Sequence, residues 1–158
     1  LFDGEKKISE QGLNNSSTSL VPKNNLLIST RVTVGKVVVN KEDIAISQDL
    51  TGMLINKNLY NAEFLAYQIK TDRIQKIFAE QKRGATIKGI TREDLKKIEL
   101  AVPDLKEQNE IASIFLCLDT KLIQAQSRKQ ALQDLFKSML NQLMTGRIRV
   151  KDLDIKVN

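Results

Sequence analysis

The chain has 158 residues, enough for one domain or for a small domain with an extension. Aromatic residues make up only 4% of it and the net charge is +6, so the core is aliphatic and the protein is mildly basic. One cysteine and no histidine argue against an internal disulfide, a zinc site and a serine–histidine catalytic arrangement. The charge suits either a polyanionic partner such as DNA or an ordinary basic surface.

Several kinds of function are disfavoured by patterns that the sequence lacks. It has no phosphate-binding glycine loop, and its acidic residues are scattered, with Glu93 and Asp94 in a capping context. We therefore expect no cofactor, no metal and no enzyme activity. No apolar run approaches the about 20 residues that cross a membrane, and no signal peptide pattern is recognised. We expect a cytoplasmic protein without a membrane partner, and a lone cysteine fits that reducing compartment.

The first half of the chain is predicted to be rich in β-structure. Residues 1–20 are polar and turn-rich, with Ile8, Leu13 and Leu20 as the only expected anchors. Short runs rich in Val, Ile and Leu follow, and Asn, Gly, Lys and Asp separate them. Gly35 interrupts a valine-rich run and indicates a tight hairpin or a bulge. The four runs predict a compact, partly antiparallel sheet and lie at residues 25–30, 32–40, 43–47 and 50–55.

Helical spacing begins at residues 61–80, where Asn61 is a candidate N-cap. The expected buried face of this helix comprises Leu65, Ile69, Ile74, Ile77 and Phe78. The stretch Thr-Arg-Glu-Asp at 91–94 predicts a capped short helix that runs through Lys97. Residues 98–102 alternate in polarity and predict one more strand, which Pro103 ends.

The last third of the chain predicts one long helix. Asp104 and Glu107 have capping-box spacing, and Gly146 supplies a stop. Steps of four and three residues alternate along an apolar seam in which Lys129 is the one polar position. Two such lysines would face each other in a parallel in-register dimer, so we expect an antiparallel partner helix. The seam comprises Ile111, Phe115, Leu118, Leu122, Ala125, Lys129, Leu132, Phe136, Met139 and Leu143. Cys117 falls outside it, and we expect that side chain to be partly buried.

Several stretches together resemble the specificity (S) subunit of type I restriction–modification systems. The segment "RGATIKGITREDLKKIELAVPDLKEQNEIASIF" contains a Gly-x-Thr motif like the one near the end of a target recognition domain. Its Pro, Glu-Gln and Ile-Ala resemble the start of the family's conserved helix. The ending "SMLNQLMTGRIRV" and the upstream "ISEQGLNNSSTSLVPKNNLLISTRVTVGKVVV" are similar to the family as well.

The resemblance implies an α+β fold with a small β-rich target recognition domain followed by one long helix in an antiparallel coiled coil. We expect the recognition domain at residues 1–102, shortened at its N-terminus, the spacer helix at 103–146 and a tail at 147–158. A complete S subunit has two such domains and two long helices. The chain therefore resembles the C-terminal part of one, and a homodimerising half-subunit, a fragment and a remnant remain open.

The resemblance also implies a function. The recognition domain would read one half of a bipartite target in double-stranded DNA, and the helix would pair with a second copy or with the missing half of the S subunit. Methyltransferase (modification) subunits would dock on the helices and carry S-adenosylmethionine, and restriction subunits would join the complex. Two alternatives stay open: an adaptor with a β-rich domain on a coiled-coil stalk, and a nuclease that uses Glu93 and Asp94.

Three loops carry side chains suited to DNA, since Arg, Lys, Asn and Gln read bases and hydroxyls and cations bind phosphates. The alternative is that these are solvated loop residues without a role in binding. The candidates are Ser29, Thr30, Arg31, Thr33 and Lys36 in the first loop, Ser47 and Gln48 in the second, and Gln81, Lys82, Arg83, Thr86 and Lys88 in the third.

Changing Lys82→Ala or Arg83→Ala tests the third loop. When a phosphate contact is lost, fewer counterions are released on DNA binding. Each change should therefore weaken duplex binding and flatten the slope of log affinity against log salt concentration by about one unit. The measurement is the affinity for duplex DNA across a salt series. An unchanged affinity and an unchanged slope in both variants would remove this loop from the DNA-facing surface.

Overall fold

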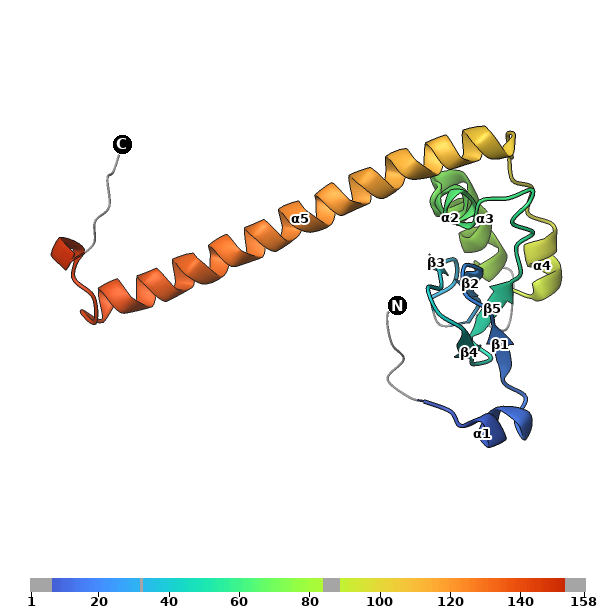
Figure 1. Cartoon of the computed structure of the whole chain (residues 1–158), viewed down its shortest axis with the longest axis horizontal. Coiled ribbons are helices and arrows are strands. Elements are labelled where there is room, and N and C mark those ends of the chain that lie inside the picture. The colour runs from blue at the N-terminus through green and yellow to red at the C-terminus, as the bar shows by residue number, and fades with distance from the viewer. Residues whose placement is uncertain (1–6, 32, 84–88, 153–158) are drawn as a thin grey trace. The chain divides into compact units, whose positions relative to one another are not determined.

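The computed structural model of the chain describes residues 7–31, 33–83 and 89–152, with the backbone alone for Lys82, Arg83 and Asp152. The chain divides into two compact units, Leu1–Phe115 and Leu116–Asn158. Its elements (Figure 1) are α1 (Glu10–Asn14), β1 (Ser19–Val21), β2 (Leu26–Ser29), β3 (Val37–Val39), β4 (Ile44–Ile46), β5 (Leu50–Met53), α2 (Ala62–Lys70), α3 (Asp72–Arg83), α4 (Arg92–Lys96), α5 (Leu105–Met144) and the 3-10 helix η1 (Val150–Asp152).

The strands form two small antiparallel sheets, where the sequence predicts a single, partly antiparallel one. One pairs β1 with β4, and the other has the order β3-β2-β5. The central strand β2 is buried on both faces. Leu26 and Ile28 face the main core, which α2 and α3 cover, whereas Leu27 faces a second core with Val21 and Ile46. These residues confirm the predicted α+β class, in which short aliphatic strands form the core of the first unit.

Two glycines allow the close approaches that this arrangement needs. A Cβ on Gly52 of β5 would lie 2.4 Å from Val21 Cγ2, so glycine lets the second sheet pack directly on the first. Gly35 has a φ of +90°, and its Cβ would lie 2.7 Å from Phe78 Cδ2. That backbone conformation suits glycine, and Gly35 lies in the connection of the β2–β3 hairpin, where the sequence predicts a tight hairpin or a bulge.

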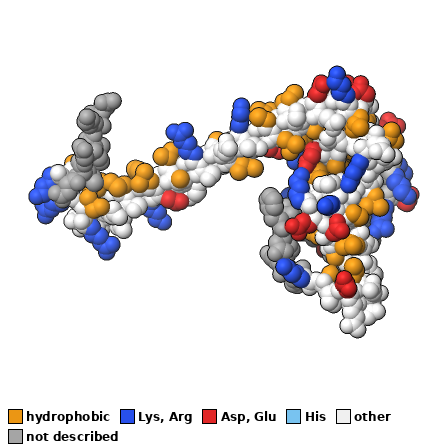
Figure 2. Space-filling model, in the orientation of Figure 1, with side chains coloured by type: hydrophobic (Ala, Val, Ile, Leu, Met, Phe, Trp, Pro, Cys, Tyr) orange, Lys and Arg blue, Asp and Glu red, His pale blue; other side chains and the backbone are white. Residues whose placement is uncertain are grey.

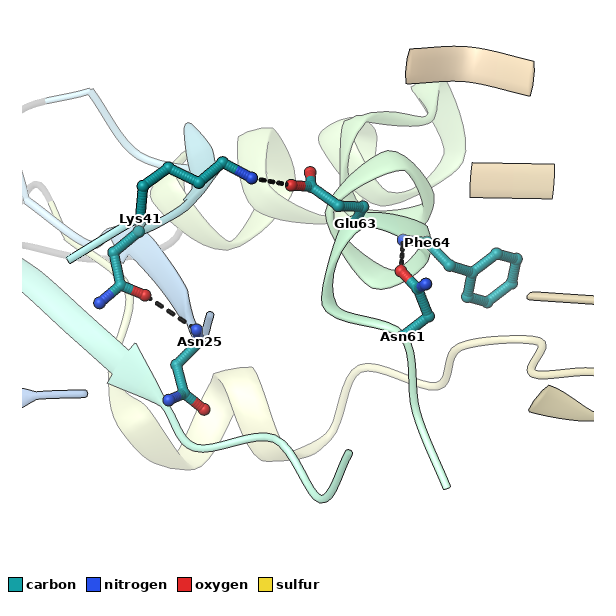
Figure 3. A network of polar contacts seen from close by, with 6 residues as sticks. Asn25, Lys41, Asn61, Glu63 and Phe64 are labelled. Carbon is teal, nitrogen blue, oxygen red and sulfur yellow. Dashed lines mark hydrogen bonds and ion pairs between the residues drawn. The ribbon is translucent and has the colours of Figure 1, made fainter. Parts of the chain in front are cut away.

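Two buried asparagines connect the ends of the strands. The Asn25 N–H donates to Asn40 Oδ1 over 2.8 Å, and Asn25 Oδ1 accepts from the Ile55 N–H over 2.7 Å. Asn40 Nδ2 also donates to the carbonyl oxygens of Val21 and Glu42. Nearby, Lys41 reaches Glu63 at the start of α2 (Figure 3). These side-chain amides satisfy backbone groups where the sheet ladders end.

The prediction of a single helix at residues 61–80 is wrong. Helices α2 and α3 are separate, and an extended residue, Thr71, lies between them. The step from Ile69 to Ile74 is five residues, which would turn the two side chains about 140° apart on one continuous helix. The break lets both face the main core. The predicted N-cap is confirmed, because Asn61 Oδ1 accepts from the Phe64 N–H over 2.9 Å (Figure 3).

The strand predicted at residues 98–102 is also wrong, since the structure assigns no strand there. Ile98 and Leu100 pack partly buried against the main core, which explains the alternation, while the Glu99 carbonyl accepts from Arg73 Nη2 over 2.7 Å. The segment thus follows the core surface without a strand partner. At the short helix, the predicted cap is confirmed by the Thr91 side chain, which accepts from the Asp94 N–H.

The prediction of an irregular segment at residues 1–20 missed two short elements, α1 and the start of β1. Ser9 caps α1 by accepting from the Gly12 N–H over 3.1 Å. Two expected anchors are wrong, because Ile8 is 44% exposed and Leu20 is 50% exposed. Val21 is the buried residue of β1 instead, since alternation along the strand points it toward the second core.

The long helix α5 begins and ends where the sequence predicts. Asp104 Oδ1 accepts from the Glu107 N–H over 2.9 Å, and Gly146 at a φ of +70° donates to the Leu143 carbonyl. The helix has 40 residues, and about three turns of it belong to the first unit. No helix among the described residues combines the length and apolarity of a membrane span.

Gln108 joins the first turn of α5 to the rest of the first unit. Its side chain is 1% exposed. Gln108 Oε1 accepts from the Asn61 N–H over 2.9 Å, and Nε2 donates to the carbonyls of Leu59 and Pro103 over 3.1 and 2.9 Å. One buried amide therefore satisfies three backbone groups, which come from the loop before α2 and the entry to α5.

Truncation of this amide should destabilise the first unit. Gln108→Ala leaves buried backbone groups without partners, so we expect the free energy of unfolding to fall by about 2–4 kcal/mol in urea titrations. The matched control is Gln124→Ala, which changes an exposed glutamine of the same helix and should alter stability by less than about 0.5 kcal/mol. Equal effects of the two changes would contradict the proposed role of Gln108.

Candidate nucleic-acid interface

Residues from all three predicted DNA loops line one hollow of about 680 Å³ in the first unit. Thr30 and Arg31 follow β2, Gln48 precedes β5, and Gln81 lies in the last turn of α3. The start of α4 completes the wall with Thr91, Arg92 and Asp94. The fold therefore brings together side chains that are up to about sixty positions apart in the sequence.

Main-chain hydrogen bonds of Thr30 build the frame of this hollow. The Thr30 N–H donates to the Asp49 carbonyl over 2.9 Å, and the Thr30 carbonyl accepts from the Ile90 N–H over 2.8 Å. A Cβ on Gly89 would lie 3.0 Å from that same carbonyl oxygen, so a glycine fits this close approach. The residue after β2 thus holds the loop before β5 on one side and the entry to α4 on the other.

Two of the predicted DNA contacts have their hydroxyls engaged inside the fold. Ser29 is 8% exposed and its Oγ lies 3.3 Å from Thr33 Oγ1. Thr30 is 5% exposed and its Oγ1 donates to the Asp49 carbonyl over 3.2 Å. Both hydroxyls therefore hold the first loop within the fold.

The remaining candidates divide by position. Arg31 and Gln48 are exposed and line the hollow, whereas Thr33 and Lys36 are exposed on the turn between β2 and β3 and do not line it. Ser47 is exposed and its Oγ accepts from the Asp49 N–H. In the third loop the side chains of Lys82 and Arg83 are not described, and Thr86 and Lys88 lie outside the described residues.

Sequence reasoning missed Arg92 as a candidate. It is exposed, lies at the first position of α4 and lines the hollow. The available signal was a basic residue directly after the capping Thr91, which we interpreted only as part of a helix start. The position of Arg92 opposite the end of β2 depends on long-range packing, which no local pattern shows.

Among the described residues that line the hollow, the charged groups are two guanidinium groups and one carboxylate. A hydrogen bond from the Thr91 hydroxyl over 2.6 Å, together with Lys97, holds the pKa of Asp94 below its usual value, so Asp94 is ionised at neutral pH. Glu93 pairs with Lys96 over 3.2 Å. Within residues 7–31, 33–83 and 89–152 no group of three metal-ligating side chains occurs. Both carboxylates considered for a nuclease are thus paired with a lysine.

A second candidate surface is the apolar seam on α5. From Leu118 to Phe136 all of its members are exposed, and Phe136 reaches 69%. Figure 2 shows hydrophobic side chains along the visible face of this helix, with basic ones between them. Cys117 is exposed too, which contradicts the expected partial burial, because nothing described packs over that part of the helix. Exposed apolar surface of this extent is typical of an interaction face.

The N-terminal end of the seam packs within the first unit. The ring of Phe115 lies 5.0 Å from that of Tyr67 on α2, and the Lys70 ammonium lies 4.8 Å from the Tyr67 ring centre. Ile111 packs partly buried against the main core. These two seam positions are therefore already covered in part by α2.

Residues 2–133 match the sequence model of a family described as the type I restriction modification DNA specificity domain. The chain belongs to this family. The match covers both the hollow and most of the seam, so the family resemblance deduced from the sequence is confirmed.

Curated members of the specificity-domain family include relatives from Methanocaldococcus jannaschii. The chain is 31% identical over 137 residues to the putative type I restriction enzyme MjaX specificity subunit, covering 87% of this chain and 32% of the relative. It is 25% identical over 139 residues to the MjaIX specificity subunit, covering 85% and 32%. The chain thus spans about a third of the length of the relatives that it matches.

Solved structures of the specificity-domain family share the fold. A chain from a study of complex assembly and conformational transition of the type I R-M system aligns with a TM-score of 0.57 at 23% identity, covering 78% of this chain and 31% of that one. The HsdS subunit from Thermoanaerobacter tengcongensis aligns with a TM-score of 0.52 at 23% identity, covering 78% and 30%.

Proposed function

We propose that the chain is a DNA sequence-specificity module of a type I restriction–modification complex that reads one half of a bipartite target. The observation that carries the proposal is the convergence of three predicted DNA loops on one hollow with two guanidinium groups, those of Arg31 and Arg92. Its polar chemistry suits phosphate and base contacts. In this proposal residues 1–102 form the recognition domain, 103–146 the spacer helix and 147–158 a tail.

In the proposed complex the chain recognises DNA and does not catalyse. Methyltransferase subunits would dock on the long helix and modify the DNA, and restriction subunits would join through the same assembly, in the cytoplasm. The relatives that support this are themselves named specificity subunits. The chain spans about a third of their length, and in this proposal the second recognition half is either a second copy or the missing half of the S subunit.

The exposed seam of α5 supports the proposed helical partner. Apolar side chains at heptad spacing are stabilised when a second helix covers them. The register that overlaps all ten seam positions in antiparallel orientation places Ala125 opposite Lys129, which keeps the two lysines apart. An adaptor on a coiled-coil stalk would use the same seam. Arg31 and Arg92 line the same hollow, which favours the DNA-reading function, because an adaptor needs no cationic groups there.

Removal of either guanidinium should weaken DNA binding without changing its sequence preference. In the complex with a methyltransferase subunit, Arg31→Ala and Arg92→Ala should each lower duplex affinity about fivefold at 0.15 M salt and flatten the salt slope by about one unit. The measurement is fluorescence anisotropy over a salt series. Lys57→Ala, which removes an exposed charge outside the hollow, is the control. Two unaffected arginine variants would leave the adaptor as the better explanation.

The partner orientation can be tested with the one cysteine of the chain. Ser138 lies three heptads after Cys117, on the same side of the seam, and it would lie almost level with Cys117 of an antiparallel second copy. We expect a thiol cross-linker that spans the outer faces of two paired helices to join two chains efficiently in Ser138→Cys and poorly in the native protein. Efficient joining through Cys117 alone would indicate parallel chains. A monomer at all concentrations would reject the second copy as the partner.

A further inference from the structure

Gln81, which lines the hollow, carries a polar atom that has no partner in the described part of the chain. Gln81 Oε1 is buried and accepts no hydrogen bond. The same helix shows what a structural glutamine looks like, because Gln75 Nε2 donates to the Gly35 carbonyl over 3.1 Å and to the Ile69 carbonyl over 2.7 Å. A buried oxygen without a donor costs folding free energy, which is a reason to ask what would supply the donor.

The surroundings of Gln81 limit which kind of ligand could donate a hydrogen bond to Oε1. Three polar side chains of the wall are already engaged, since Thr30 Oγ1 donates to the Asp49 carbonyl and the Thr91 hydroxyl donates to Asp94. Gln81 lines the same hollow as Arg31 and Arg92. Gln81 therefore carries a neutral, unused amide oxygen and shares its hollow with two cationic groups that suit a phosphate backbone.

An acceptor selects a ligand that donates. On the major-groove edge of DNA the donors are the amino groups at adenine N6 and cytosine N4, whereas guanine O6 and thymine O4 are acceptors. A glutamine amide matches adenine best, because its oxygen accepts from N6 while its nitrogen donates to N7. The terminal torsion of glutamine is broad, so Oε1 can turn toward a base that enters the hollow.

We propose that Gln81 reads a base that carries an amino donor, with adenine as its best match, while Arg31 and Arg92 hold the backbone on either side. The proposal rests on the proposed function and adds to it a specificity-determining residue and a base class. It also explains why the fold tolerates an unpaired oxygen: that oxygen is paired when DNA is bound.

The test replaces Gln81 with leucine, which keeps the shape and removes the amide. In the complex with a methyltransferase subunit, selection from a randomised duplex pool should show that Gln81→Leu loses preference for an amino-bearing base at one position of the site. A bidentate contact corresponds to discrimination of about 5- to 150-fold, which should fall to near one. The salt slope should stay unchanged, because no phosphate contact is removed.

Two further readouts separate a reading residue from a structural one. The melting temperature of Gln81→Leu should be unchanged or higher, since the substitution removes an unsatisfied buried oxygen. Gln11→Leu, which changes an exposed glutamine outside the hollow, is the matched control and should keep the preference that Gln81→Leu loses. A lower melting temperature with a uniform loss of affinity would show a structural residue and overturn the proposal.

The wild-type complex distinguishes this proposal from the proposed function. If it selects particular bases and Gln81→Leu selects the same ones equally well, the assignment of Gln81 fails and the specificity function stands. If the wild-type complex shows no salt-dependent binding to duplex DNA, the proposed function fails and the assignment of Gln81 fails with it.

Discussion

Strand β2 needs hydrogen-bond partners along both edges and apolar cover on both faces. The first unit is organised around that requirement. The edges of β2 pair with β3 and β5, while its faces contribute Leu26 and Ile28 to one core and Leu27 to the other. The hydrogen bonding continues beyond the strand, where the Thr30 backbone binds Asp49 and Ile90. The hollow is therefore an extension of the sheet, and its geometry depends on the same buried strand.

The sequence predicts those parts of the fold that depend on local chemistry. Caps at Asn61 and Asp104 and the turn at Gly35 are visible because each needs a particular residue type at one position. The break at Thr71 is not visible in the sequence, because apolar residues at helical spacing lie on both sides of it. The alternation at residues 98–102 was misleading, since contact with a core surface produces the same pattern as a strand.

The candidate site was predictable in chemistry but not in arrangement. The loops were recognised because Arg31, Gln48 and Gln81 carry groups that suit DNA. Their meeting in one hollow, the inclusion of Arg92 and the burial of Thr30 all come from contacts between distant segments. Gln81 was one of several polar residues in the sequence, and only its unpaired oxygen distinguishes it from structural amides such as Gln108.

The main-chain hydrogen bonds around Thr30 affect how the target specificity of such a module can evolve. Every residue except proline carries the N–H and carbonyl that the frame uses, so the side chains that point from it are free to vary. Exchanges at Gln48, which is exposed, or at Gln81, which is partly buried, would leave the core intact. Under the proposed function, a new target sequence is then a few point mutations away, with no rebuilding of the scaffold and little loss of stability.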